Sequence, residues 1–107
     1  MNEAGTIELG ENGCAFLAGA LTFESVPVLF RETEKLFKGS RPVTLIDLSK
    51  VTTADSAGLA LLLEWQAMQT AKSGKLEINN APPGLMSLAN LCEADEVMIM
   101  SGRNPGA

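Results

Sequence analysis

The segment that decides the fold is VTLIDLSKVTTADSAGLALLL, residues 43–63. It begins with an apolar strand, Val43 to Leu48, passes through a short polar loop, and continues into a helix that starts at Asp55-Ser56. The loop presents the hydroxyl of Ser56 at the positive end of that helix. A hydroxyl in this position can cap the helix, contact a partner or accept a phosphate.

The residues around this loop have distinct predicted roles. Asp55 is the expected N-cap, because its carboxylate can accept N–H bonds from residues two or three positions further on. Ser56 then takes the first helical position and its side chain is free to point outward. Ala57 and Gly58 are small, so another chain could approach the backbone closely. The alternative is that these residues only cap the helix, together with the threonines before them: Thr52, Thr53, Asp55 and Ser56.

Asp47 interrupts the apolar strand. A carboxylate near the end of a central strand is costly unless it finds hydrogen-bond donors. We expect it either to accept backbone N–H bonds from the following loop or to hold that loop for a partner, and the two roles are compatible.

The helix after the loop, predicted to end at Ser73, carries two apolar stripes: Leu59, Leu62 and Leu63 form the first, and Leu61, Trp65 and Met68 form the second. A helix on one face of a small sheet can bury one stripe and not the other. We therefore expect the second stripe to be exposed and to belong to a protein–protein interface. The alternative is that both stripes are buried.

The rest of the chain alternates strands with helices. We expect a hairpin over 6–9 and 14–18 with 19–22 leaving the sheet, a helix over 24–38, a strand over 75–79, a helix from 83 or 84 to 91, and a strand over 96–100. The order β-β-α-β-α-β-α-β predicts an α/β fold whose mixed sheet contains an N-terminal hairpin and carries its helices mainly on one face. All of 1–107 is expected to form a single domain, with its core over about 6–100 and a flexible tail over 101–107.

Charge and composition exclude several classes of function. The net charge is −5 and no run of Lys or Arg exists, so binding to nucleic acid or directly to anionic lipid is not expected. Neither a secretion signal nor an apolar run of membrane-spanning length is visible, which favours a cytoplasmic protein without direct membrane insertion.

The common catalytic groups are missing as well. The chain contains no His and no Tyr, and its two cysteines, Cys14 and Cys92, are isolated and are expected to be buried reduced thiols. Without His, Ser56 has no activating base, and no metal site can form from two isolated thiols. We expect no enzymatic activity, no metal and no cofactor.

Residues 45–59, LIDLSKVTTADSAGL, closely resemble the signature of STAS domains, the fold of anti-sigma factor antagonists and of sulfate-transporter tails. The segment LAGALT at 17–22 is similar to that family's exit from its second strand, and the likeness spans about residues 6–100. The resemblance implies that Ser56 is the serine that a partner kinase phosphorylates in sigma-regulating members. It also implies that Asp47 and Asp55 are the acidic positions around that serine.

A second branch of the family is more similar: the small cytoplasmic subunit of bacterial phospholipid-trafficking ABC transporters, the MlaB type. Those proteins are short, have a helix start like Leu59 to Leu63, and end soon after the position of Met100. The resemblance implies a non-enzymatic adaptor, peripheral to the inner membrane, that binds the ATPase subunit through Asp55-Ser56 and the following helix. The alternative is an anti-sigma factor antagonist that an anti-sigma factor kinase switches by phosphorylating Ser56.

Overall fold

The computed structural model describes residues 5–11, 13–37, 43–72, 76–94 and 99–102. Its elements follow the predicted order of strands and helices. Their bounds are β1 Thr6–Leu9, β2 Cys14–Leu21, α1 Val26–Phe37, β3 Leu45–Ala54, α2 Ser56–Lys72, β4 Glu77–Ala81, α3 Pro83–Leu91 and β5 Ile99–Gly102.

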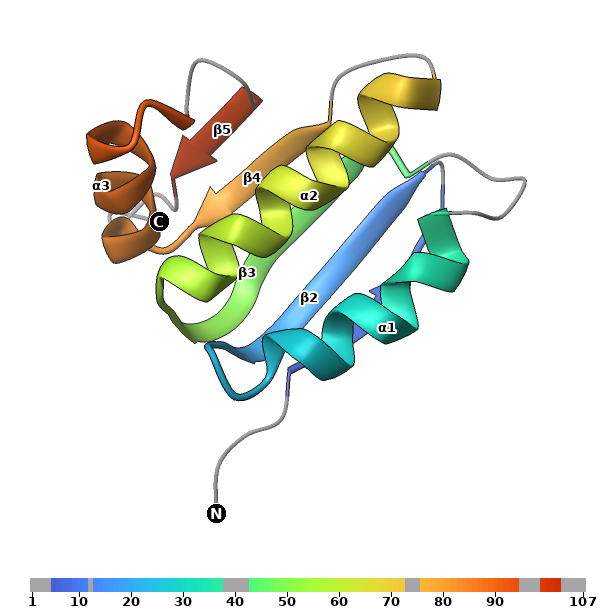
Figure 1. Ribbon diagram of the computed structural model, residues 1–107, viewed down its shortest axis with the longest axis horizontal. Coiled ribbons are helices and arrows are strands. Elements are labelled where there is room, and N and C mark those ends of the chain that lie inside the picture. The colour runs from blue at the N-terminus through green and yellow to red at the C-terminus, as the bar shows by residue number, and fades with distance from the viewer. Residues whose placement is uncertain (1–4, 12, 38–42, 73–75, 95–98, 103–107) are drawn as a thin grey trace.

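The five strands form one mixed sheet in the order β1-β2-β3-β4-β5 (Figure 1). β1 and β2 pair antiparallel as a hairpin, with Glu8 opposite Phe16. The pairs β2–β3, β3–β4 and β4–β5 are parallel, as expected for strands joined through helical crossovers. The predicted mixed sheet with an N-terminal hairpin is therefore confirmed.

The helices cover mainly one face of the sheet, also as predicted. Figure 1 shows α1 and α2 lying across the same face, with α3 beside β5 at the edge of the sheet. On β3 the alternating pattern follows this arrangement: Ile46 and Leu48 are buried, whereas Leu45 and Asp47 are only half-buried. The opposite face carries exposed side chains such as that of Phe16.

β2 and β3 extend further than the sequence pattern predicts. β2 continues past Ala18 to Leu21, and β3 continues past Leu48 to Ala54, so most of the predicted polar loop is strand. The two extensions pair with each other, with Lys50 opposite Ala18 and Ala54 opposite Leu21. The backbone N–H and C=O groups of these extensions form hydrogen bonds between the two strands. The extensions are therefore strand, although their side chains are of types that are common in loops.

The helices lie where they are predicted, and the C-terminal strand ends two residues later than predicted. α3 has the predicted span, and α1 begins at Val26, slightly later than expected. β5 begins at Ile99, whereas the prediction placed a strand over 96–100, of which 96–98 lie outside the described residues. The predicted tail starts too early, because Ser101 and Gly102 belong to β5. Residues 103–107 lie outside the described part of the chain.

Trp65 lies in the hydrophobic core, so the prediction that the second stripe of α2 is exposed is wrong. Trp65 is fully buried and Leu61 is 2% exposed, while Met68 is partly buried against the same core. The indole Nε1–H donates a hydrogen bond to Oγ1 of Thr33 on α1 at 2.9 Å. Leu61 and Trp65 are buried because α2 packs against α1 as well as against the sheet.

The two cysteines are free, but neither is fully buried, contrary to prediction. Cys14 is half-buried at the start of β2, and Cys92 is exposed at the C-terminal end of α3. Burial raises the pKa of the Cys14 thiol, and the negative charge of Asp47 on the neighbouring strand raises it further.

Candidate functional site at the start of helix α2

Asp55 caps the first turn of α2. Its Oδ1 accepts hydrogen bonds from the backbone N–H groups of Ala57 at 2.9 Å and of Gly58 at 3.4 Å. These are two of the N–H groups that have no acceptor within the helix. The backbone carbonyl of Asp55 accepts the first helical bond, from the N–H of Leu59 at 3.2 Å. The carboxylate thus sets the residue at which α2 begins.

The same carboxylate ties α2 to the loop that follows β2. Oδ2 of Asp55 accepts a hydrogen bond from the backbone N–H of Phe23 at 3.1 Å. The backbone N–H of Asp55 donates to the carbonyl oxygen of Leu21, also at 3.1 Å. Because β2 and β3 are parallel neighbours, their carboxyl ends meet at one edge of the sheet, and this places the two loops side by side.

Ser56 presents its hydroxyl to solvent. It occupies the first position of α2 and is exposed. Among the described residues, its side chain makes no hydrogen bond. Thr53, three residues earlier, is also exposed, whereas Ala57 is half-buried. The structure therefore leaves the Ser56 hydroxyl available at the positive end of a helix, and Asp55 alone provides the side-chain cap.

Gly58 supports the loop from inside the protein. It is buried, and a Cβ atom at this position would lie 2.7 Å from the carbonyl oxygen of Leu21 and 2.9 Å from the Leu21 Cβ. The chain that approaches this backbone is therefore the end of β2. The predicted supporting role fits this packing, whereas close approach of another molecule at Gly58 does not.

Asp47 bonds within β3 and to β4. Oδ1 accepts from the backbone N–H of Ser49 at 2.8 Å, and Oδ2 accepts from the side-chain amide of Asn80 at 3.0 Å. Asn80 has a φ of 60°, in the left-handed region, where the register between β4 and β5 shifts. These bonds join β3 to the end of β4 and give the half-buried carboxylate its donors, although Ser49 belongs to β3 and not to the loop in which a donor was expected.

The exposed side of α2 is different from the predicted one. Leu61 and Trp65 point into the core, so they cannot line a docking surface. Ala60, Glu64 and Ala67 are exposed and Leu63 is half-buried, which places them on the outer side of the helix. This row of residues begins at Ser56, and Glu64 is its only charged member. The Ser56 hydroxyl therefore lies at one end of a helix surface of low polarity.

Phe23 was missed by the sequence analysis. Its side chain is 81% exposed, although an aromatic residue between a strand and a helix is ordinarily expected in the core. The signal that could have found it is local: Thr22, Glu24 and Ser25 are turn-forming or polar neighbours, so Phe23 belongs to a turn rather than to either apolar element.

In the part of the chain that the structure describes, the start of α2 offers a contact site, and no base is seen to bind the Ser56 hydroxyl. The Asp55 oxygens accept hydrogen bonds from the backbone N–H groups of Phe23, Ala57 and Gly58, so this carboxylate is not directed at the Ser56 hydroxyl as a base.

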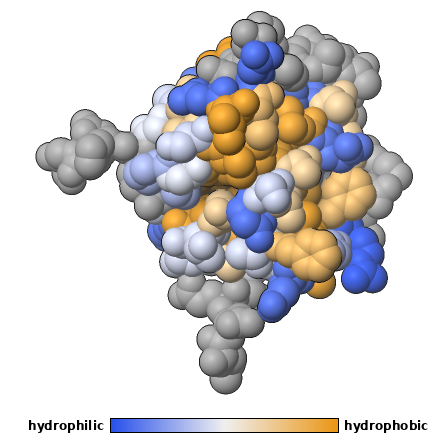
Figure 2. Space-filling view, turned by 60° about the vertical axis from the view of Figure 1, so that its left-hand side comes forward, coloured by the Kyte–Doolittle hydropathy of each residue, from blue (hydrophilic) through white to orange (hydrophobic). Residues whose placement is uncertain are grey.

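Hydrophobic side chains gather in the middle of the face shown in Figure 2 and are bordered by polar ones. None of the helices that the structure describes is long and apolar enough to cross a bilayer.

Comparison with solved structures defines the fold as that of STAS domains. The anti-sigma factor antagonist SpoIIAA in its unphosphorylated form matches with a TM-score of 0.70 at 15% identity, covering 94% of this chain and 90% of that chain. The phosphorylated form of SpoIIAA, a Bacillus cell fate determinant, gives 0.69 at 16% identity, covering 92% and 91%. A Thermotoga maritima protein assigned as an anti-sigma factor antagonist gives 0.73 at 15% identity, covering 90% and 84%. At these identities the likeness concerns the fold alone.

The family follows from the sequence itself. The family model described as "Mlab, STAS domain" matches residues 10–100. The chain therefore belongs to the MlaB-type STAS family. A comparison with curated proteins found no match.

Proposed function

We propose that this domain is a non-enzymatic cytoplasmic adaptor that binds the ATPase subunit of a phospholipid-transport ABC transporter of the Mla type. Such transport maintains the lipid asymmetry of the outer membrane. The observation that carries the proposal is the exposed Ser56 hydroxyl, which has no partner among the described residues and sits on a rigidly capped helix. Membership of the MlaB-type family supports the choice of partner.

The proposed docking surface begins at the loop and continues along the outer side of α2. It contains Thr53 near the end of β3, Ser56 and Ala57 in the first turn of α2, and Ala60 and Leu63 further along the helix. Asp55 and Gly58 hold this surface in place through the cap and through packing on Leu21. The surface differs from the sequence-based expectation in that Leu61 and Trp65 are excluded, because both are buried.

The test is binding of the purified domain to the purified ATPase subunit from the same organism, measured by calorimetry. We expect Ser56→Arg and Ser56→Asp to raise the Kd about tenfold or more, since both place a charge in the contact. Ser56→Thr keeps the hydroxyl and is expected to bind within about threefold of the wild type.

Ser87→Arg is the matched control. Ser87 is an exposed serine on α3, so the same change in size and charge is made on another helix. We expect its Kd to equal that of the wild type. Unchanged binding by both Ser56→Arg and Ser56→Asp would falsify the docking site.

One observation favours a second candidate, a phospho-switched anti-sigma factor antagonist. The Ser56 hydroxyl is accessible at the N-terminus of a helix, where a phosphate is tolerated electrostatically. Mass analysis of the domain purified from its native host separates the two candidates. A phosphorylated fraction at Ser56 together with a kinase-type anti-sigma partner would favour the antagonist, whereas unmodified Ser56 and co-purified transporter subunits would favour the adaptor.

A further inference from the structure

Phe23 is exposed to an unusual degree for an aromatic side chain. Among the described residues, it and Leu91 share the largest exposed fraction of any large hydrophobic side chain, 81%. Phenylalanine is ordinarily buried, and a large exposed apolar side chain is costly in water. Single exposed aromatic rings are common on protein surfaces, so the exposure of Phe23 does not by itself indicate a binding site.

The backbone on both sides of Phe23 is held in a fixed turn. The Thr22 N–H donates to the Ser25 hydroxyl oxygen at 2.9 Å, and that hydroxyl donates to the Ala20 carbonyl at 2.6 Å. The N–H groups of Ser25 and Val26 both donate to the carbonyl of Thr22, at 3.0 and 2.9 Å. The Phe23 N–H itself is bonded to Asp55. The turn is therefore ordered before anything binds to it.

A fixed turn with an outward aromatic ring has the properties of a binding anchor. Ordering a loop upon binding opposes association, and this cost is avoided when the loop is already fixed. Buried aromatic anchors at the centre of interfaces contribute disproportionately to affinity. The hydrogen bonds described above are made by the backbone of the turn and by Ser25, so they do not involve the ring of Phe23.

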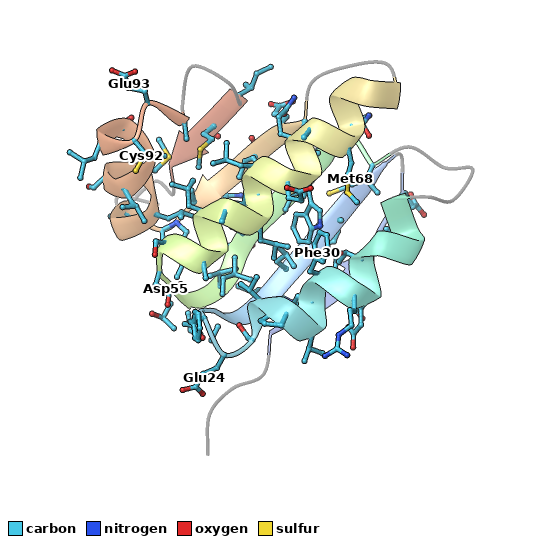
Figure 3. The ribbon with its side chains drawn as sticks, in the orientation of Figure 1. Glu24, Phe30, Asp55, Met68, Cys92 and Glu93 are labelled. Carbon is cyan, nitrogen blue, oxygen red and sulfur yellow. The ribbon has the colours of Figure 1, made fainter. Side chains whose placement is uncertain are left out.

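The position of the turn relates it to the start of α2. Asp55 binds the Phe23 N–H with one oxygen and the Ala57 N–H with the other, so a single carboxylate separates the two segments. Figure 3 shows Asp55 and Glu24, the residue after Phe23, toward the lower side of the molecule. A partner that contacts Ser56 would thus have Phe23 within the same footprint.

We propose that Phe23 is a second anchor of the docking surface and inserts into an apolar pocket of the protein partner next to its contact with Ser56. This inference rests on the proposed function, because the partner is taken to be the same ATPase subunit. The partner is expected to have a pocket lined by aliphatic or aromatic side chains for Phe23. Next to this pocket it is expected to have a polar group that forms a hydrogen bond with the Ser56 hydroxyl.

The experiment compares Phe23→Ala with Leu91→Ala, its match in exposure on another element. Both side chains are 81% exposed, so neither change is expected to shift the midpoint of thermal unfolding appreciably. In calorimetric titrations of the purified ATPase subunit, we expect Phe23→Ala to raise the Kd about tenfold or more and Leu91→Ala to leave it unchanged. Phe23→Leu, which keeps an apolar side chain, is expected to retain most of the affinity.

The outcomes separate this inference from the proposed function. Wild-type affinity of Phe23→Ala, with binding lost in Ser56→Arg, overturns the anchor and leaves the docking site standing. Loss of binding in Phe23→Ala alone supports the anchor and overturns the role of Ser56. No binding by the wild type overturns both.

Two other molecules that could contact the Phe23 ring, a second copy of this chain and lipid, are tested directly. Concentration-dependent dimerisation that Phe23→Ala abolishes, measured by sedimentation, would assign the ring to a second copy of this chain and overturn the proposal. Flotation with vesicles of phosphatidylethanolamine and phosphatidylglycerol that depends on Phe23 would assign it to lipid, with the same consequence.

Discussion

The indole N–H of Trp65 on α2 donates a hydrogen bond to the hydroxyl of Thr33 on α1 at 2.9 Å, and both side chains are fully buried. The Thr33 hydroxyl in turn donates to the carbonyl of Leu29 at 2.8 Å. This chain of hydrogen bonds allows the one tryptophan to enter the core with its polar atom satisfied. It joins the two helices that lie on the same face of the sheet. Because the Trp65 side of α2 is buried against α1, the candidate docking surface lies on the other side of α2.

Trp65→Ala is expected to destabilise the fold without changing the affinity for a partner. Removing a fully buried Trp side chain costs about 3–5 kcal/mol in the free energy of unfolding. The measurement is urea denaturation of the variant beside calorimetric binding under conditions where the variant remains folded. A higher Kd for the variant with an unchanged free energy of unfolding would show instead that Trp65 contacts the partner.

Thr33→Val removes the acceptor while keeping the shape of the side chain. The buried indole N–H then loses its acceptor in Thr33, and we expect a loss of about 1–3 kcal/mol in unfolding free energy. Trp65→Phe in the same background removes the donor, so the double variant should lose less than the sum of the two single losses. Strict additivity would show that the two side chains are not coupled.

Asp55→Ala removes the helix cap together with the bond to Phe23. We expect a loss of about 1–2 kcal/mol in unfolding free energy, at the upper part of the range for N-caps because two segments are released. Asp55→Asn keeps an oxygen that can accept from Ala57 and is expected to lose less. Chemical denaturation of both variants gives the comparison, and equal losses would contradict a capping role.

Gly58→Ala and Gly84→Ala form a matched pair. The Cβ added at Gly58 would lie 2.7 Å from the Leu21 carbonyl oxygen, whereas nothing lies within 4 Å of the one added at Gly84. Both glycines are in first turns of helices. We expect Gly58→Ala to lower the unfolding free energy by about 1–3 kcal/mol, and Gly84→Ala to leave it unchanged or raise it by up to about 1 kcal/mol. Thermal unfolding of the pair checks both signs.

The thiol of Cys14 is expected to react more slowly than that of Cys92. Burial and the charge of Asp47 raise the pKa of Cys14, so at a given pH near neutrality less of it is thiolate, the reactive form. Asp47→Asn removes the negative charge, which should lower the pKa of Cys14 and increase its rate of alkylation. The measurement is site-resolved labelling with iodoacetamide between about pH 7 and pH 9, around the ordinary thiol pKa, with exposed Cys92 as the internal reference. A Cys14 rate unaffected by Asp47→Asn would show that the charge has no influence.

Local chemistry was sufficient to predict much of this domain. The order of strands and helices follows from hydrophobic periodicity and turn residues, and Asp55 was identified as the N-cap because its hydrogen bonds reach only two or three residues along the chain. The position of Ser56 at the start of the helix follows from the same cap, because the N-cap residue fixes where the helix begins. These features depend on neighbours in sequence, so the sequence alone contains them.

Tertiary structure decided the features that depend on distant partners. β3 runs to Ala54 because β2 pairs with it, and Trp65 is buried because α1 supplies both cover and an acceptor in Thr33. Phe23 lies beside the start of α2 because two parallel strands end at one edge of the sheet. Periodicity shows how many faces of a helix are apolar, but which of them meets solvent depends on the packing of elements far apart in the chain.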